Sequence, residues 1–281
     1  MKYKVILFYK FTEIESPERL MKEQRKLCES LGLKGRMFIA KEGINATFEG
    51  AEENIEKYKN TLAEDGRFED IVFKESVGTG KAFSRLQVTA KKEVVTLGVG
   101  EFDIKGETAP EIRAEELEEM YKNNEDFVVL DLRNDFEVEV GYFDKTYNPN
   151  LKNFRDLPQN VEKLSSLKAR KVVAVCTGGI RCAKATCLLK KEGFNNLYQL
   201  KDGIHTYIEK YPNSHFKGAL FVFDNRMIVR VGENNNSEVV GKCFSCNKEC
   251  EKFWSDDSLR PSRKVICCQD CVGSYANLRA C

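Results

Sequence analysis

The first hundred residues alternate short apolar runs with two amphipathic segments. Apolar and β-branched residues predict strands over 2–11, 34–40, 45–49, 70–74 and 83–91. Helices are predicted over 17–31, where Ser16 can cap and Pro17 suits the first turn, and over 51–62. The order strand, helix, strand, strand, helix, strand, with one further strand, is that of a ferredoxin-like domain.

From residue 110 the pattern changes to helices that alternate with short buried strands. Helices are predicted over 114–123 and 182–192, and strands over 127–132, 171–175 and 196–200. This alternation is typical of a parallel sheet with helices on its faces, which gives an α/β domain. A stretch at 98–110 with three glycines and a proline separates it from the first domain.

Beyond Pro212 the pattern weakens. A β-like segment at 220–231 contains an Asp224–Asn225 turn, and a polar GENNNSE linker at 232–238 leads to a cysteine-rich tail. We therefore expect a ferredoxin-like domain at 1–97, an α/β domain at 110–213, and a β segment with a cysteine-rich tail at 214–281.

Composition limits the class of protein. With 42% hydrophobic and 32% charged residues the chain can bury a normal core, which excludes disordered and collagen-like classes. The longest apolar runs fall far below the roughly 20 residues that span a bilayer, and the N-terminus lacks the features of a signal peptide. We expect a soluble cytoplasmic protein. Its net charge of +1 provides no global attraction for a polyanion, so any nucleic-acid contact must come from local patches.

The eleven cysteines are unevenly distributed, since only Cys28 lies outside residues 176–281. In a reducing compartment, such clustering favours thiolate catalysis or metal binding over disulfides.

The segment VVAVCTGGIRCAKA combines a strand, a cysteine, two glycines, an arginine and a helix. The carboxyl end of a strand in an open α/β sheet is the usual ligand site, and glycines let successive amides turn inward to bind an anion. We expect Thr177, Gly178, Gly179 and Ile180 to form this anion-binding loop. A helix N-terminus and Arg181 would favour the Cys176 thiolate.

The alternative, that Cys176 is a small buried apolar residue, is disfavoured by the neighbouring glycines and arginine. Cys182 leaves two possibilities open, packing or a resolving thiol, of which we favour packing. His205 and His215 fall in no metal-ligand spacing and are interpreted as ordinary residues.

The tail contains two cysteine groups, C-x2-C-x3-C and C-C-x2-C, and this spacing predicts a structural zinc site. The expected ligands are Cys243, Cys246, Cys268 and Cys271. Cys250 and Cys267 leave open a shifted set or a second ion, and reduced, metal-free thiols are the alternative. Phe244, Phe253 and Trp254 could stack on bases, although such aromatics more often cover a small zinc core.

The CTGGIR loop, with the upstream LDLRNDFEVEVGYF and the downstream LYQLKDGI, resembles the rhodanese superfamily. That resemblance implies that Asp131 and Arg133 support the active loop and belong, with Cys176 and Arg181, to the catalytic set. The sequence departs from the family at Asp202, where glycine is usual. This change affects how the turn at Asp202 fits against the active loop.

Three further segments, RMFIAKEGINATFEG, AFSRLQVTAKKEVVTLG and HFKGALFVFDNRM, resemble one branch only, the tRNA wobble-uridine 5-hydroxylase family, from about Lys2 to Cys271. This resemblance implies an oxidoreductase that uses molecular oxygen to convert the wobble uridine of the tRNA anticodon to 5-hydroxyuridine. It also implies an essential cysteine at Cys176 and no established metal or flavin in the reaction. The sequence shows no evident flavin or nicotinamide site.

Two other functions stay open at this point. The loop alone also permits a sulfurtransferase that carries a persulfide on Cys176, and a rhodanese fold used only for binding is weakened by the presence of Cys176 and Arg181. The N-terminal domain is either a dimerisation or scaffold module or an RNA-facing platform, since its sheet bears Lys34, Arg36, Lys41 and Asn45. The sequence leaves the oligomeric state unknown.

Overall fold

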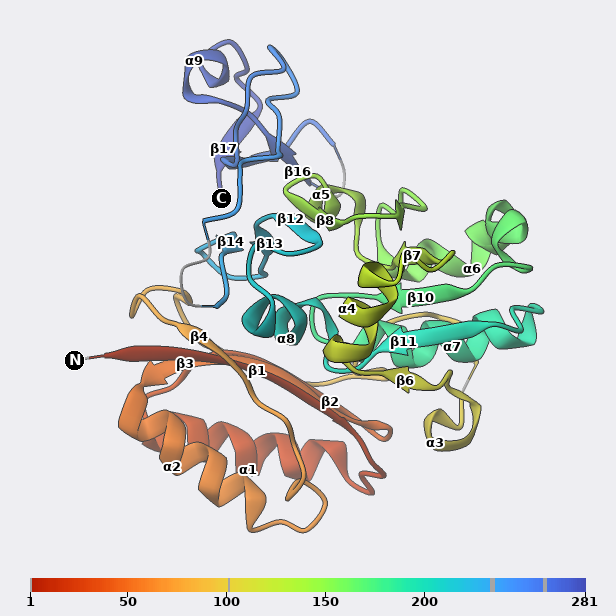
Figure 1. Ribbon diagram of the computed structural model, residues 1–281. Coiled ribbons are helices and arrows are strands. Elements are labelled where there is room, and N and C mark those ends of the chain that lie inside the picture. Colours follow the sequence, from red (N-terminus) through yellow and green to blue (C-terminus); the bar gives the residue numbers. More distant parts are fainter. Residues whose placement is uncertain (1, 101, 233–235, 260–261) are drawn as a thin grey trace. The chain divides into compact units, whose positions relative to one another are not determined.

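The computed structural model describes residues 2–100, 102–232, 236–259 and 262–281 (Figure 1). The chain forms two compact units, Met1–Thr96 and Leu97–Cys281. Each unit contains its own cluster of buried apolar side chains. No helix among the described residues is both long enough and apolar enough to cross a membrane.

The N-terminal unit is a five-stranded sheet with two main helices. Its elements are β1 (Tyr3–Phe11), α1 (Pro17–Ser30), β2 (Lys34–Ala40), β3 (Gly43–Ala51), α2 (Glu52–Ala63), β4 (Lys74–Val77) and β5 (Leu86–Ala90). The strand order is β4-β1-β3-β2-β5, in which the first four strands have the ferredoxin-like arrangement and β5 is added parallel to β2. The predicted fold class is confirmed for this unit.

Alternate residues along the central strands form the core of this unit, as the two-residue period of a strand requires. Ile6 and Phe8 of β1 and Phe48 of β3 are fully buried, and they cluster with residues of α1 and α2. Figure 1 shows both helices on the same face of the sheet. Tyr58 of α2 donates a hydrogen bond from its hydroxyl to Gln24 of α1 at 2.7 Å, which joins the two helices.

Two local predictions in this unit are wrong. Ser16 occupies the N-cap position of α1, but its side chain makes no capping hydrogen bond, so Pro17 carries the helix start. The strand predicted at 70–74 begins only at Lys74. The preceding residues form turns instead, with the N–H of Ile71 bonded to the carbonyl of Phe68 at 3.2 Å. Ile71 packs against the core without joining the sheet.

The second unit is built on a parallel sheet, as predicted, and this sheet has five strands. Its main elements are β6 (Glu111–Ile112), α4 (Ala114–Lys122), β7 (Val128–Asp131), β9 (Thr146–Tyr147), β10 (Val172–Val175), α7 (Ile180–Lys191), β11 (Leu197–Leu200) and α8 (Gly203–Lys210). The order is β6-β11-β10-β7-β9, and every neighbouring pair is parallel. Residues 172–175 of β10 are all buried, because both faces of the sheet are covered.

Short elements of this unit were not predicted, because most have only three or four residues and η2 is a 3-10 helix, so none carries a readable α-helical or strand period. They are α3 (Ile104–Glu107), α5 (Asp135–Val138), β8 (Gly141–Phe143), η1 (Phe154–Asp156), α6 (Leu157–Asn160) and η2 (Val161–Leu167). In addition, α7 begins at Ile180 rather than at the predicted Cys182, because Gly179 adopts a φ of 98° and occupies the N-cap position.

The C-terminal part of this unit consists of small β elements. β12 (Phe216–Gly218) pairs with β8, and β13 (Leu220–Phe221) forms a hairpin with β14 (Ile228–Val229) around the predicted turn. The tail contains β15 (Phe253–Asp256), β16 (Arg263–Ile266), α9 (Gln269–Val272) and β17 (Leu278–Ala280), with strand order β16-β15-β17. Residues 233–235 of the predicted linker lie outside the described residues.

Candidate active site and metal centre

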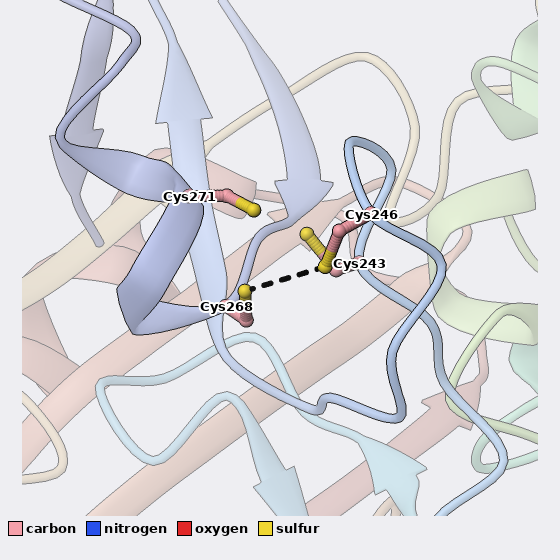
Figure 2. Close-up of side chains that lie close together, drawn as sticks. All are labelled: Cys243, Cys246, Cys268 and Cys271. Carbon is pink, nitrogen blue, oxygen red and sulfur yellow. Dashed lines mark hydrogen bonds between the residues drawn. The ribbon is translucent and has the colours of Figure 1, made fainter.

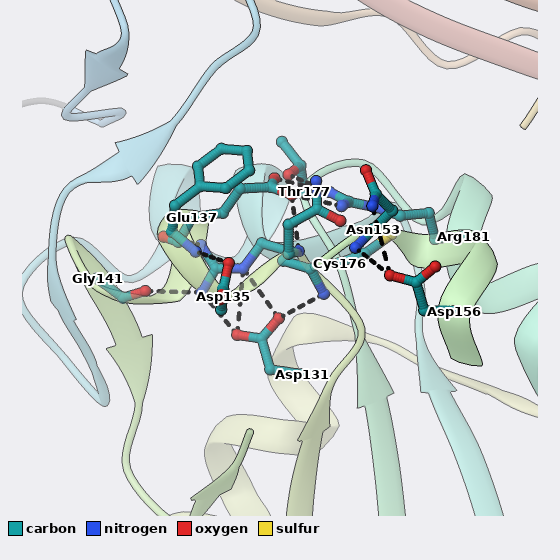
Figure 3. Close-up of polar contacts among 12 residues, drawn as sticks. Asp131, Asp135, Glu137, Gly141, Asn153, Asp156, Cys176, Thr177 and Arg181 are labelled. Atoms are coloured by element: carbon teal, nitrogen blue, oxygen red, sulfur yellow. Dashed lines mark hydrogen bonds and ion pairs between the residues drawn. The ribbon is translucent and has the colours of Figure 1, made fainter. Parts of the chain in front are cut away.

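The Cys176 loop lies between the carboxyl end of β10 and the amino end of α7 (Figure 3). Cys176 is fully buried. The backbone N–H of Gly179 donates to its sulfur at 3.2 Å, and the backbone N–H groups of Arg181 and Cys182 also point to it. The loop therefore surrounds one sulfur with several donors, the arrangement that stabilises an anion at a helix start.

Electrostatics favour the thiolate of Cys176. Burial acts to raise its pKa, but the hydrogen bond from the Cys182 thiol, the charge of Arg181 and the backbone donors outweigh burial. The net result is a pKa lowered to about 5. The thiolate is therefore the dominant form at neutral pH, and the thiolate is the nucleophilic form of cysteine.

Cys182 makes a hydrogen bond in addition to its packing contacts. Its side chain is fully buried in the first turn of α7 and is hydrogen-bonded to Cys176. Burial and the neighbouring Cys176 charge raise the pKa of Cys182 well above its ordinary value. It therefore stays protonated and donates to the Cys176 sulfur, which is a contact that packing alone would not require.

Arg181 is held by an acid that the sequence reasoning missed. Its two terminal nitrogens donate to the Glu137 carboxylate at 2.6 and 2.9 Å, and one of them also donates to Thr177 Oγ1 at 3.0 Å. Glu137 is fully buried on α5. A buried arginine requires a counter-ion, and this requirement is the signal that could have directed attention to the acids of the LDLRNDFEVEVGYF segment.

Asp131 and Arg133 form a second buried ion pair. Arg133 Nε and a terminal nitrogen donate to the Asp131 carboxylate at 2.9 and 2.6 Å. Arg133 also donates to the backbone carbonyls of Glu137 and Gly141, at 3.3 and 2.7 Å. This pair therefore holds the segment that carries Glu137, whereas Thr177 lies in the loop and Arg181 in the first turn of α7. Figure 3 shows Asp131, Glu137, Thr177 and Arg181 around Cys176.

The first turn of α8 also holds the loop. The N–H groups of Ile204 and His205 donate to the carbonyls of Cys176 and Thr177, at 2.9 and 3.0 Å. A Cβ at Gly203 would lie 2.6 Å from the Cys176 carbonyl oxygen, so only glycine fits there. Asp202 has a φ of 60°, a left-handed conformation that glycine adopts more readily.

In the tail, the described residues contain one cluster suited to a metal ion, formed by Cys243, Cys246, Cys268 and Cys271. Their sulfurs all lie within 4.8 Å of one another, and the Cys246 and Cys268 sulfurs are 3.6 Å apart (Figure 2). Tetrahedral zinc with bonds of about 2.3 Å places its sulfurs about 3.8 Å apart. The donor set therefore fits a structural metal ion.

Cys250 and Cys267 do not belong to this cluster. Cys267 is fully buried, its sulfur lies 4.0 Å from that of Cys243, and burial raises its pKa to about 12. Cys250 packs against the apolar cluster around Phe253.

The tail aromatics have separate roles. Phe253 is 4% exposed and packs against Phe221, so it cannot stack on a base. Trp254 donates from Nε1 to the carbonyl of Cys267 at 2.9 Å. Phe244 is 52% exposed and contacts Tyr275. Of the three, Phe253 belongs to the apolar core of the tail, and half-buried Trp254 is held by its hydrogen bond to Cys267.

Both histidines pack within the second unit, outside the cysteine cluster. His215 stacks on Tyr121 with ring centroids 3.9 Å apart and hydrogen-bonds to Asp144 at 3.1 Å. His205 is buried in α8. Neither belongs to the metal-suited cluster found among the described residues.

Three parts of the chain match known family models. Residues 3–94 match the family described as UPF0176 acylphosphatase like domain, and residues 217–281 match the family described as Rhodanase C-terminal. The parallel sheet, the Cys176 loop and a match of residues 113–210 to the Rhodanese-like domain family define a rhodanese-domain protein.

Relatives that align along almost the whole chain narrow the family. The proteins from Onion yellows phytoplasma (37% identical, covering 94% of this chain and 87% of the relative), Bacillus licheniformis (36%, 99% and 87%) and Bacillus cereus (37%, 99% and 88%) are named tRNA uridine(34) hydroxylase. This chain belongs to the tRNA uridine(34) hydroxylase family.

Among solved structures, similarity covers a smaller part of the chain. A rhodanese-like domain from Anabaena is 22% identical, with 40% of this chain and 80% of that chain covered and a TM-score of 0.33. A rhodanese-like domain protein from Staphylococcus aureus is 23% identical, with 35% and 90% covered and a TM-score of 0.31.

Proposed function

We propose that this chain hydroxylates carbon 5 of the wobble uridine, position 34, in tRNA, with Cys176 as the catalytic thiolate. The single observation that carries the proposal is the buried Cys176 sulfur surrounded by hydrogen-bond donors, in a chain whose full-length relatives are named tRNA uridine(34) hydroxylase. The enzyme class is therefore an oxidoreductase that modifies tRNA.

The proposed reaction uses the thiolate as a covalent catalyst. The Cys176 sulfur adds to carbon 6 of the uracil ring, and the electron pair moves to carbon 5. Carbon 5 then attacks an oxygen donor, forming the C–O bond as the donor's O–O bond breaks. Loss of the proton from carbon 5 expels the thiolate and restores the ring. The donor is at the peroxide level, formed from molecular oxygen by an external two-electron donor with two protons, and its second oxygen leaves as hydroxide and takes up the proton from carbon 5 to give water.

The surrounding residues have distinct proposed roles. The backbone of the loop binds the anion, which is the Cys176 thiolate, and Arg181 stabilises negative charge on the sulfur. The loop consists of Thr177, Gly178, Gly179 and Ile180. Asp131 and Arg133 act as positioning residues, because their contacts reach the segment that carries Glu137 rather than the sulfur itself.

The remaining parts have supporting roles in this proposal. We assign 1–97 to an RNA-facing domain, 110–213 to the rhodanese domain and 214–281 to the β segment and tail. Cys243, Cys246, Cys268 and Cys271 would hold zinc, which would supply structural stability to a segment that buries few apolar side chains. The partner is tRNA, and a cytoplasmic location agrees with a tRNA substrate and eleven free cysteines.

The proposal is tested by nucleoside mass spectrometry of tRNA from a deletion strain. Re-introducing the natural chain, or Cys281→Ser as a control at an exposed cysteine, should restore 5-hydroxyuridine derivatives, whereas Cys176→Ser should not. Full hydroxylation by Cys176→Ser would refute the role of the thiolate. Loss of a thiolated nucleoside in the deletion strain, with hydroxylation intact, would favour a sulfurtransferase that carries a persulfide on Cys176.

A further inference from the structure

Asp135 forms a polar contact between the cysteine-rich tail and the active-site half of the second unit. It is the first residue of α5 and is 6% exposed. Its Oδ2 atom forms ion pairs with Lys152, at 2.7 Å, and with Arg263 of β16. Its Oδ1 accepts the backbone N–H of Phe136 at 2.7 Å. Arg263 of the tail thus shares with Lys152 the neutralisation of a buried charge at the start of α5.

The next residue, Phe136, also packs toward the tail. Its ring lies 5.1 Å from that of Phe221, which in turn lies 5.0 Å from Phe253 of β15. Phe253 and Ile266 of the tail are buried in the same cluster as Val140, which follows α5 in the sequence. The apolar core of the tail is therefore continuous with the packing of α5.

Glu137 follows Phe136 and carries the contact to the active site. Its carboxylate accepts the N–H of Asn134 at 2.8 Å and both terminal nitrogens of Arg181. Since α5 contains only residues 135–138, these contacts share one helical turn. Because Asp135 and Glu137 lie on the same helical turn, we expect a shift of Asp135 to displace the Glu137 carboxylate and Arg181 with it.

We propose that Arg263 is a positioning residue for the Cys176 loop, which it holds through Asp135, α5 and the Glu137–Arg181 ion pair. The cysteine-rich tail is therefore part of the active-site scaffold. The inference rests on Cys176 being the reactive thiol of the proposed function, and it adds a tail residue to the set that controls this thiol. The groups that act on the Cys176 charge are Arg181, Cys182 and the backbone donors of the loop.

The test is the pH dependence of iodoacetamide alkylation at Cys176 in the full chain, followed by mass spectrometry for Arg263→Gln and Arg263→Lys. The matched control is Arg230→Gln. Arg230 forms the same kind of ion pair to the tail, with Glu251 at 2.7 Å, but it does not contact Asp135. Thermal unfolding of each variant separates loss of fold from loss of positioning.

For Arg263→Gln we expect the midpoint of Cys176 alkylation to rise by about one pH unit, so that the rate at pH 5 falls roughly fivefold. Arg263→Lys and Arg230→Gln should match the natural chain. An unchanged Arg263→Gln profile, or an equal change in Arg230→Gln, would overturn the proposal. Because alkylation needs no tRNA, this result stands apart from failure of the proposed hydroxylation.

Discussion

The Glu137 carboxylate and the Arg181 guanidinium form a buried two-point ion pair, with distances of 2.6 and 2.9 Å. The two residues come from different elements, α5 and α7, and are 0% and 8% exposed. Each charge depends on the other for compensation, because water does not solvate either one well. This pair fixes the start of α7 relative to α5 and thereby fixes the donors around Cys176.

Removing Glu137 should therefore destabilise the second unit. In Glu137→Ala the buried Arg181 charge loses its counter-ion, and we expect the free energy of unfolding to fall by about 3–5 kcal/mol. Urea unfolding followed by circular dichroism measures this change. The exposed Glu119→Ala, on α4, is the control and should change it by less than about 0.5 kcal/mol. Equal stability of the two variants would contradict the structural role of the ion pair.

Gly203 should tolerate no side chain. In Gly203→Ala the new Cβ would lie 2.6 Å from the Cys176 carbonyl oxygen and 2.7 Å from the Gly179 nitrogen, so the loop must move. We expect a lower melting temperature and slower alkylation of Cys176. Gly193→Ala is the matched control, because Gly193 also has a positive φ, of 91°, but has open space around it. It should lose stability without changing Cys176, and a similar loss of reactivity there would count against the steric explanation.

The lowered pKa of Cys176 links stability to pH. The folded-state pKa of about 5 lies below the unfolded thiol value of about 8.5, so between these values the unfolded chain binds more protons. The contribution is complete above the unfolded value and is lost as pH falls toward 5. The stability of the natural chain relative to Cys176→Ser should therefore increase from pH 5 to pH 9 in urea unfolding. A constant difference over that range would exclude the depressed pKa.

Zinc binding should depend on the four clustered cysteines. Purified natural chain should contain a single zinc ion, measured by inductively coupled plasma mass spectrometry, and Cys268→Ser should lose it because a tetrahedral site needs all four ligands. Cys250→Ser removes a cysteine outside the cluster and should retain the metal. Retention of zinc by Cys268→Ser, or its loss from Cys250→Ser, would require a different ligand set.

The longer elements could be predicted from the sequence because their side-chain periods are clear. Helix α4 begins at Ala114 and strand β10 covers 172–175, both close to the predicted bounds. In contrast, the apolar residues near Ile71 resemble a strand but pack without joining the sheet. A short apolar run specifies burial, and only tertiary packing decides whether its backbone pairs with a neighbour.

Part of the candidate site could also be predicted from the sequence, because some of its residues lie close together along the chain. Cys176 and Arg181 lie in one continuous segment, so their proximity follows from local spacing. Glu137 lies on a four-residue helix far from them in the sequence, and no local pattern places it beside Arg181. The role of Gly203 likewise depends on how two turns meet, which the sequence of either turn does not specify.

The most direct test of the account is the titration of Cys176 itself. The ultraviolet absorbance of the thiolate in the natural chain, minus that of Cys176→Ser, isolates this sulfur from the other ten. We predict a transition with its midpoint near pH 5, since the loop donors and Arg181 stabilise the thiolate. A midpoint above about pH 8, the range of an ordinary thiol, would contradict the central claim that this loop makes Cys176 a nucleophile at neutral pH.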